Sequence, residues 1–203
     1  MSYKTLREKF RLSSYYNQYA TDKFNLGYID YIYDDLFTDR ISPRLILEIG
    51  ACNGESLRLW HDWFINAQVH GIDNGLNPSF NSTDNAQRWI YQQPRVTIHI
   101  GDAYSDLIQS LPHNFDIIID DGPHTVESQQ FCAANYTKKL QLGGILIIED
   151  ILNSNSVNII IESIPNDIDA DITIYHMNGK QKTIELRNKF PNGLDAIVII
   201  RNH

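Results

Sequence analysis

Five short apolar runs recur along the chain, and each has the length of a strand rather than a helix. They cover residues 45–49, 68–73, 96–100, 115–119 and 144–148. Residues 115–119 are apolar apart from Asp116, and their isoleucines are stiff at χ1, which suits an extended backbone. A run that is apolar almost throughout is typical of a strand buried on both faces of a sheet. The pattern therefore predicts strands in the interior of a parallel sheet.

Segments with helical spacing separate these runs. Helices are expected at residues 55–64, 104–110, 125–140 and 154–164, and a weaker one at 82–92. Strand followed by helix, repeated five times, predicts an α/β fold with a doubly wound, mostly parallel sheet. Three alternating segments at 171–175, 182–186 and 196–200 predict an antiparallel edge at the C-terminal end.

The N-terminal forty residues carry apolar and aromatic positions at helical spacing, both within 2–20 and within 28–37. The tyrosines of this segment admit two interpretations, a lid over a bound ligand or a packed pair of helices. We expect one domain over residues 1–203, with a helical N-terminal cap at 1–40 and an α/β core at 44–203.

Composition excludes some classes of protein. The chain of 203 residues has a formal net charge of −8, which argues against a general nucleic-acid binder. No apolar run is long enough for a transmembrane helix, and the first residues lack the apolar core of a secretory signal. Two cysteines imply no disulfide framework. The expectation is a cytoplasmic enzyme or binding protein without a membrane or nucleic-acid partner.

Polar side chains cluster where the predicted strands end. Asp120, Asp121 and His124 follow the fourth strand, and Glu149 and Asp150 follow the fifth. The carboxyl ends of parallel strands form the edge at which α/β proteins bind ligands, so these groups should share one crevice. The alternative is that the acids serve as ordinary helix caps and turn residues.

The first strand leads into a glycine-containing loop, Gly50 to Gly54, preceded by Glu48. Glycines there let the backbone approach a ligand closely. Asp73 ends the second strand, where an acid can bond the two hydroxyls of a ribose. The simpler interpretation of Asp73 is a loop cap to Asn74 and Gly75. The loop lacks the Gly-x-Gly-x-x-Gly pattern expected of a nicotinamide enzyme.

These motifs together resemble the class I S-adenosylmethionine-dependent methyltransferases, whose fold is Rossmann-like. More narrowly they resemble the macrocin O-methyltransferase-like enzymes, which methylate sugar hydroxyls of macrolides and related natural products. The resemblance covers roughly residues 20 to 150 and rests on the following segments: Thr21-Asp22-Lys23, Tyr28 and Tyr31, 47–57, 71–73, 101–103, 120–124 and 148–150.

The resemblance implies roles for individual residues. The cofactor S-adenosyl-L-methionine would be bound by Glu48, Gly50, Asp73, Asp102, Ala103 and Asp120, with Asp102 and Ala103 against the adenine. A divalent metal would be bound by Asp121, Glu149 and Asp150, and His124 would be the general base.

The carboxylates also support a metal on chemical grounds alone. Three carboxylates suit a hard cation such as Mg²⁺ or another divalent ion, whereas no cysteine and histidine cluster has the spacing of a Zn²⁺ site. Together with these carboxylates, the resemblance implies a metal-dependent O-methyltransferase acting on a hydroxyl of a sugar or glycosylated small molecule. A catechol-type O-methyltransferase, a nucleotide-dependent oxidoreductase and a non-catalytic cofactor-binding protein stay open, as does a homo-oligomeric state.

Overall fold

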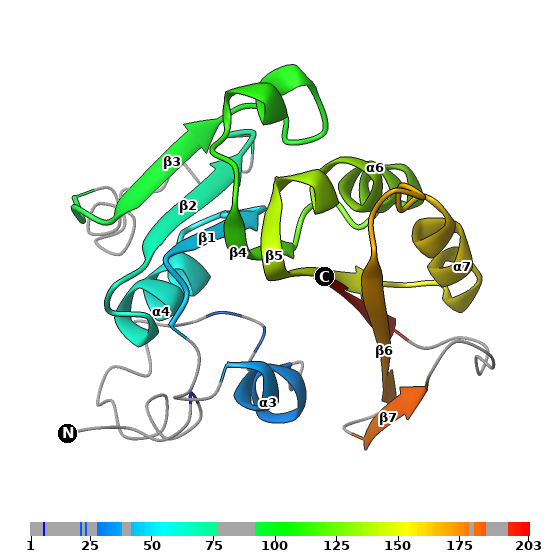
Figure 1. Ribbon diagram of the computed structural model, residues 1–203. Coiled ribbons are helices and arrows are strands. Elements are labelled where there is room, and N and C mark those ends of the chain that lie inside the picture. The colour runs from blue at the N-terminus through cyan, green and yellow to red at the C-terminus, as the bar shows by residue number, and fades with distance from the viewer. Residues whose placement is uncertain are drawn as a thin grey trace.

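The structure is a computed structural model that describes residues 6, 21, 23, 28–37, 42–76, 92–178, 181–185 and 195–203. Within these residues, eight strands form one sheet in the order β3-β2-β1-β4-β5-β8-β6-β7 (Figure 1). Neighbours from β3 to β5 are parallel, and the three pairs from β5 to β7 are antiparallel. The strands are β1 (Leu45–Ile49), β2 (Gln68–Asp73), β3 (Val96–Ile100), β4 (Phe115–Asp120), β5 (Leu140–Ile151), β6 (Ala170–Asn178), β7 (Gln181–Glu185) and β8 (Asp195–Asn202). The predicted fold class is confirmed.

Among the described residues, helical segments follow β1, β3, β4 and β5 as expected. The helical segments are the π-helix η2 (Ile29–Tyr33), α3 (Asp34–Leu36), α4 (Glu55–Trp63), the 3₁₀ helix η4 (Asp106–Ser110), α6 (Val126–Asn135), the 3₁₀ helix η5 (Thr137–Lys139) and α7 (Ser154–Glu162). The helix predicted to run to residue 140 ends at Asn135, and β5 begins at Leu140 instead of Gly144. Gly143 has a φ of 76°, so the glycine pair lies within an irregular strand rather than before it. The predicted helices at 2–20 and 82–92 lie outside the described residues.

Each face of the sheet carries its own apolar core, as a doubly wound arrangement requires. On one face, Ile117 and Ile119 pack with residues of α4 and of the N-terminal segment. On the other, Ile118 packs with residues of α6 and α7. Figure 1 shows α3 and α4 on one side of the sheet, and α6 and α7 on the other. The alternation of side chains along β4 therefore supplies both cores.

The N-terminal segment packs tightly onto α4. Tyr33, Phe37 and Trp60 are fully buried, and the ring centroids of Phe37 and Trp60 are 5.5 Å apart in an edge-to-face arrangement. Tyr28 is buried as well. Tyr28 and Tyr33 are therefore part of the packed core of this segment, and their hydroxyl groups reach the site described below. Within the described part of the chain, the longest and most apolar helices still fall short of what crossing a membrane requires.

Candidate functional site

The register of the central strands brings the predicted site residues to one edge of the sheet. Asp120 of β4 pairs with Ile49 of β1 on one side and with Ile148 of β5 on the other. The glycine loop after β1, the acids after β4 and the acids at the end of β5 are consequently neighbours. The backbone N–H of Asp121 donates to the Ile49 carbonyl at 3.0 Å, which ties the end of β4 to the start of the glycine loop.

Gly50 is required by the closeness of these two segments. Its φ is 83°, and a Cβ at this position would lie 2.0 Å from the carbonyl oxygen of Asp121. A side chain is excluded on both counts, because left-handed backbone and backbone contact each favour glycine. Gly54, with a φ of 79°, is the N-cap residue that precedes α4.

A cavity of about 790 Å³ lies over this edge, and four of the six predicted cofactor residues line it: Gly50, Asp73, Asp102 and Ala103. Asp73 accepts hydrogen bonds from the backbone N–H groups of Cys52 at 2.8 Å and Gly75 at 2.7 Å. The simpler interpretation of Asp73 as a cap of its own loop is therefore correct, and the residue also faces the cavity. The same carboxylate shapes the glycine loop through Cys52.

Glu48 and Asp120 are not among the residues lining this cavity. Glu48 is fully buried and accepts from the Trp60 indole N–H at 3.0 Å, and burial raises the pKa of its carboxyl. Asp120 is buried too, and burial raises its pKa to about 6. Cofactor roles for these two residues stay predictions.

Tyr104 is a cavity residue that the sequence interpretation missed. It lines the cavity, and its hydroxyl donates to Asp120 Oδ1 at 2.5 Å. The only signal in the sequence for a role at the cavity was its position directly after Ala103. An aromatic residue at that position is equally typical of the apolar core.

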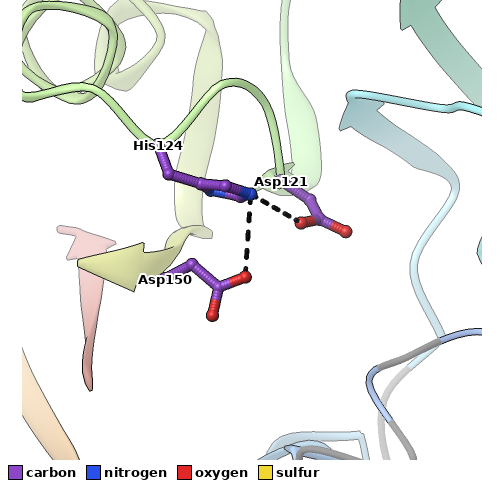
Figure 2. Close-up of side chains that lie close together, drawn as sticks. All are labelled: Asp121, His124 and Asp150. Atoms are coloured by element: carbon purple, nitrogen blue, oxygen red, sulfur yellow. Dashed lines mark ion pairs between the residues drawn. The ribbon is translucent and has the colours of Figure 1, made fainter. Parts of the chain in front are cut away.

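Asp121, His124 and Asp150 come together at the edge of the sheet. One ligand atom from each lies within 4.8 Å of the others, and His124 Nε2 is 3.7 Å from an oxygen of either carboxylate (Figure 2). His124 and Asp150 have φ values of 56° and 51°, a backbone region costly for side-chain-bearing residues. Such strain tends to persist where the surroundings impose a functional geometry. His124 also lies before the Thr125 N-cap rather than on the first turn of α6.

Glu149 faces a different set of groups. Its Oε2 lies 2.6 Å from Lys23 Nζ, and its Oε1 accepts from the Tyr33 hydroxyl. Lys23 Nζ also donates to Asp121 Oδ2 and lies 3.3 Å from Glu48 Oε1. Burial alone would lower the pKa of Lys23, but Glu149, Asp121 and Glu48 together hold it well above the ordinary value. An N-terminal lysine is thus buried against three carboxylates.

The donor atoms fit a divalent cation. Asp121 and Asp150 supply carboxylate oxygens, the ligands that Mg²⁺ and Mn²⁺ prefer, and His124 adds an imidazole nitrogen within the same group. Side chains of these three residues keep 15–29% of their surface accessible, so an ion and a ligand oxygen can reach them. Tyr28 adds a further N-terminal contact, since its hydroxyl donates to Asp150 Oδ1.

An open, mostly parallel sheet with a glycine loop after β1 and a cavity at its carboxyl edge is the architecture in which α/β proteins bind nucleotide-like cofactors. A family model described as a methyltransferase domain matches residues 47–151, which include the glycine loop and every predicted site residue. The chain belongs to this methyltransferase family.

Two curated relatives are O-methyltransferases by name. The 8-demethyl-8-alpha-L-rhamnosyl tetracenomycin-C 2'-O-methyltransferase of Streptomyces olivaceus is 25% identical over 150 residues, which are 68% of this chain and 36% of that protein. The mycinamicin VI 2''-O-methyltransferase of Micromonospora griseorubida is 28% identical over 155 residues, 69% of this chain and 36% of that protein. The chain spans about a third of the length of these relatives.

Solved structures are similar as well. Cofactor-bound Rv0187 from MTB has a TM-score of 0.58 at 16% identity, covering 79% of this chain and 73% of that one, and so shares the fold. The MycE methyltransferase from the mycinamycin biosynthetic pathway, in complex with Mg and SAH, has a TM-score of 0.46 at 27% identity. That match covers 58% of this chain and 31% of MycE.

Proposed function

We propose that this protein is an S-adenosylmethionine-dependent, divalent-metal-dependent O-methyltransferase that acts on a hydroxyl of a sugar or glycosylated small molecule. The observation that carries the proposal is the convergence of Asp121, His124 and Asp150 in a chain of the methyltransferase family. Asp121 also lines the large cavity, so the group lies where a cofactor and an acceptor can meet.

The residues lining the cavity are the ones proposed to hold the cofactor. S-adenosyl-L-methionine, when bound, supplies a methyl group activated by its positively charged sulfur. Gly50 allows close backbone approach, and the Asp73 carboxylate retains acceptor capacity for ribose hydroxyls beyond its two loop hydrogen bonds. Asp102 and Ala103 are proposed to lie along the adenine. Asp120 is proposed to act through Tyr104, whose hydroxyl it binds at the cavity wall.

His124 is proposed to take the proton of the acceptor hydroxyl. A neutral hydroxyl is a poor nucleophile, so transfer of the methyl group needs a base within reach. The imidazole keeps 29% of its surface accessible, so an acceptor hydroxyl can reach its Nε2. A histidine also changes charge near neutral pH, which suits a base of this kind.

The divalent cation is proposed to bind at Asp121, Glu149 and Asp150. A divalent ion, when bound, lowers the pKa of a coordinated hydroxyl and fixes its orientation. Asp121 and Asp150 present their carboxylates side by side at an accessible face. Both carboxylate oxygens of Glu149 already accept hydrogen bonds, one from Lys23 and one from Tyr33. Glu149 would have to give up one of these hydrogen bonds to coordinate the ion beside Asp121 and Asp150.

A sugar-bearing acceptor is supported by the name of one curated relative, which methylates a rhamnosyl tetracenomycin, and both relatives are named as O-methyltransferases. Because the chain matches about a third of each relative, the acceptor is proposed only as a class. A cytoplasmic location belongs to the same proposal, and cell fractionation tests it.

The test is turnover with purified protein. S-adenosylmethionine and Mg²⁺ are supplied with rhamnosylated and macrolide acceptors beside a simple catechol, and the demethylated cofactor is followed by mass spectrometry. We expect methyl transfer to a sugar hydroxyl that EDTA abolishes and Mg²⁺ restores. Preference for the catechol would correct the acceptor class. Full activity in EDTA would refute the metal requirement, and binding of the cofactor without turnover on any acceptor would favour a non-catalytic protein.

A further inference from the structure

Lys23 is a fully buried charged group beside the site. Its side chain is 1% accessible, although it comes from an N-terminal segment 98 residues away from Asp121 and 126 away from Glu149. A lysine is almost never fully buried unless its charge is paired. The pairing here is threefold, with Glu48, Asp121 and Glu149 all facing the one ammonium group.

The ammonium occupies the space between two of the carboxylates proposed to hold the metal. It contacts Asp121 Oδ2 and lies 2.6 Å from Glu149 Oε2. The other oxygen of Glu149 accepts from Tyr33, while Oδ1 of Asp121 faces His124. A cation bridging Asp121 and Glu149 would therefore need the position that Lys23 holds.

The charges of this group are not balanced by Lys23 alone. Three carboxylates face a single ammonium. Glu48 Oε1 is buried and, among the residues that the structure describes, has no hydrogen-bond partner; its contact with Lys23 is an ion pair at 3.3 Å. Buried carboxylates short of positive charge are costly unless a cation or a bound proton compensates them, and burial raises the pKa of Glu48 and of Glu149. A cation with more charge than one ammonium is the compensation that leaves all three carboxylates ionised.

We propose that Lys23 is the resident cation of the metal-free site, and that a divalent ion binds by displacing its ammonium from between Asp121 and Glu149. This inference rests on the metal requirement of the proposed function. The two cations repel each other and compete for the same oxygens, so only one of them can bridge the two carboxylates. Lys23 belongs to the segment that also contributes Tyr28 and Tyr33, so loading of the ion loosens the contacts of that segment with the end of β5.

The first experiment is calorimetric titration of Mg²⁺ and Mn²⁺ into the full chain. The variants are Lys23→Met, which removes the competitor, Lys23→Arg, which keeps the positive charge, and the double variant Lys23→Met with Glu149→Gln. We expect Lys23→Met to bind the ion at least ~10-fold tighter than wild type, since a competing charge is gone. Lys23→Arg should show no such gain, and the double variant should lose it because a ligand is removed.

The opposite results are equally clear. Unchanged or weaker binding by a folded Lys23→Met protein would make Lys23 a positioning residue instead of a competitor. A double variant as tight as Lys23→Met would mean that the ion uses Asp121, His124 and Asp150 alone, with Lys23 remaining in place. No binding to either wild type or Lys23→Met would refute the metal requirement, and this inference with it.

A second measurement needs no variant, and it decides the matter if Lys23→Met does not fold. Wild-type protein is treated with acetic anhydride with and without saturating Mg²⁺, and acetylation of each lysine is quantified by mass spectrometry. Lys23 should be protected in the metal-free protein and should react several-fold faster with the ion bound. Lys138 provides the reference for reactivity that the ion does not alter, since it is exposed and lies in η5. Protection of Lys23 under both conditions would overturn the displacement, even if turnover proves metal-dependent.

Discussion

Gly50 and Asp121 touch through their backbones: a Cβ on Gly50 would lie 2.0 Å from the Asp121 carbonyl oxygen. This contact joins the loop proposed to hold the cofactor to the strand end that carries the candidate metal ligand and base. The spacing between the two ligand-binding halves of the site is therefore set by a residue without a side chain.

Replacing Gly50 with alanine should separate these halves. The φ of 83° alone costs a non-glycine residue roughly 1–3 kcal/mol, and the overlap with Asp121 adds to it. We expect Gly50→Ala to lower the free energy of unfolding by more than about 3 kcal/mol and to weaken binding of S-adenosylmethionine. Chemical denaturation and calorimetry measure the two effects.

Gly143→Ala is the matched control for that variant. Gly143 also has a positive φ, 76°, but a Cβ there meets no atom within 4 Å. It should show only the conformational cost and leave cofactor binding intact. Equal losses in the two variants would mean that backbone strain, not the contact with Asp121, explains Gly50.

The sequence predicted well which residues meet at the carboxyl edge of the sheet. It predicted poorly which residues pack around that edge. Parallel neighbours end together, so Asp121, His124 and Asp150 could be brought to one place from strand order alone. Glu48 was expected to bind the cofactor, and that role stays a prediction. It does not line the cavity, and it shares the face of β1 with Ile46, which packs toward the N-terminal segment. Residues alternate between faces along a strand, so an acid one position before the strand end points away from its neighbour Ile49.

The contacts of Lys23 and Tyr33 could not be derived from local patterns. Both residues reach Glu149 across more than 100 positions of the chain. Helical spacing marks which face of the segment is apolar, but it does not encode where that face docks. Only the resemblance to a family pointed to the motif Thr21-Asp22-Lys23. No charge pattern near it predicted that the Lys23 ammonium pairs with distant carboxylates.

Stability should fall at mildly acidic pH because of two stacked histidines. His70 Nδ1 lies 2.9 Å from His99 Nε2, and burial, followed by the charge of His99, lowers the pKa of His70 to about 4. Burial lowers the pKa of His99 as well. A histidine with a depressed folded-state pKa binds fewer protons folded than unfolded, so stability is full above pH ~6.5 and declines as the pH falls toward 4.

The loss should be on the order of 1–2 kcal/mol for His70, allowing for solvent screening of a half-buried group. Urea denaturation from pH 7.5 to 4.5 measures it. His70→Gln cannot take up this proton, so the difference between variant and wild type should shrink or reverse across that range. Parallel curves for the two proteins would show that the pair does not contribute.

Asp73 should be important for the cofactor. Asp73→Ala removes an acceptor that faces the cavity and holds the loop at Cys52, so S-adenosylmethionine affinity should fall by roughly 1.5–3 kcal/mol. Asp106→Ala, which changes an exposed acid that does not line the cavity, should bind as wild type. Calorimetry decides, and equal affinity for NAD or an unaffected Asp73→Ala protein would contradict the assignment.

His124 Nε2 lies 3.7 Å from a carboxylate oxygen of Asp121 and 3.7 Å from one of Asp150. At this position the imidazole can serve either as a general base or as a ligand of the metal. The two roles differ in what survives its removal. A base is needed only while the hydroxyl loses its proton, so His124→Gln should bind cofactor and Mg²⁺ within a few-fold of wild type. Its kcat should nevertheless fall roughly 10²–10⁴-fold, the usual contribution of a positioned general base.

Chemical rescue tests the same role from the other side. His124→Ala leaves space beside Asp121 and Asp150 that free imidazole can enter, and added imidazole should restore part of kcat in proportion to its concentration. A nitrogen that merely coordinated the ion would instead show itself in metal affinity, because removing a ligand weakens binding whether or not an acceptor is present. We therefore expect unchanged Mg²⁺ titrations together with imidazole-dependent turnover. Loss of metal binding in step with activity would reassign His124 as a ligand, and near-normal turnover by His124→Gln would move the base to another group.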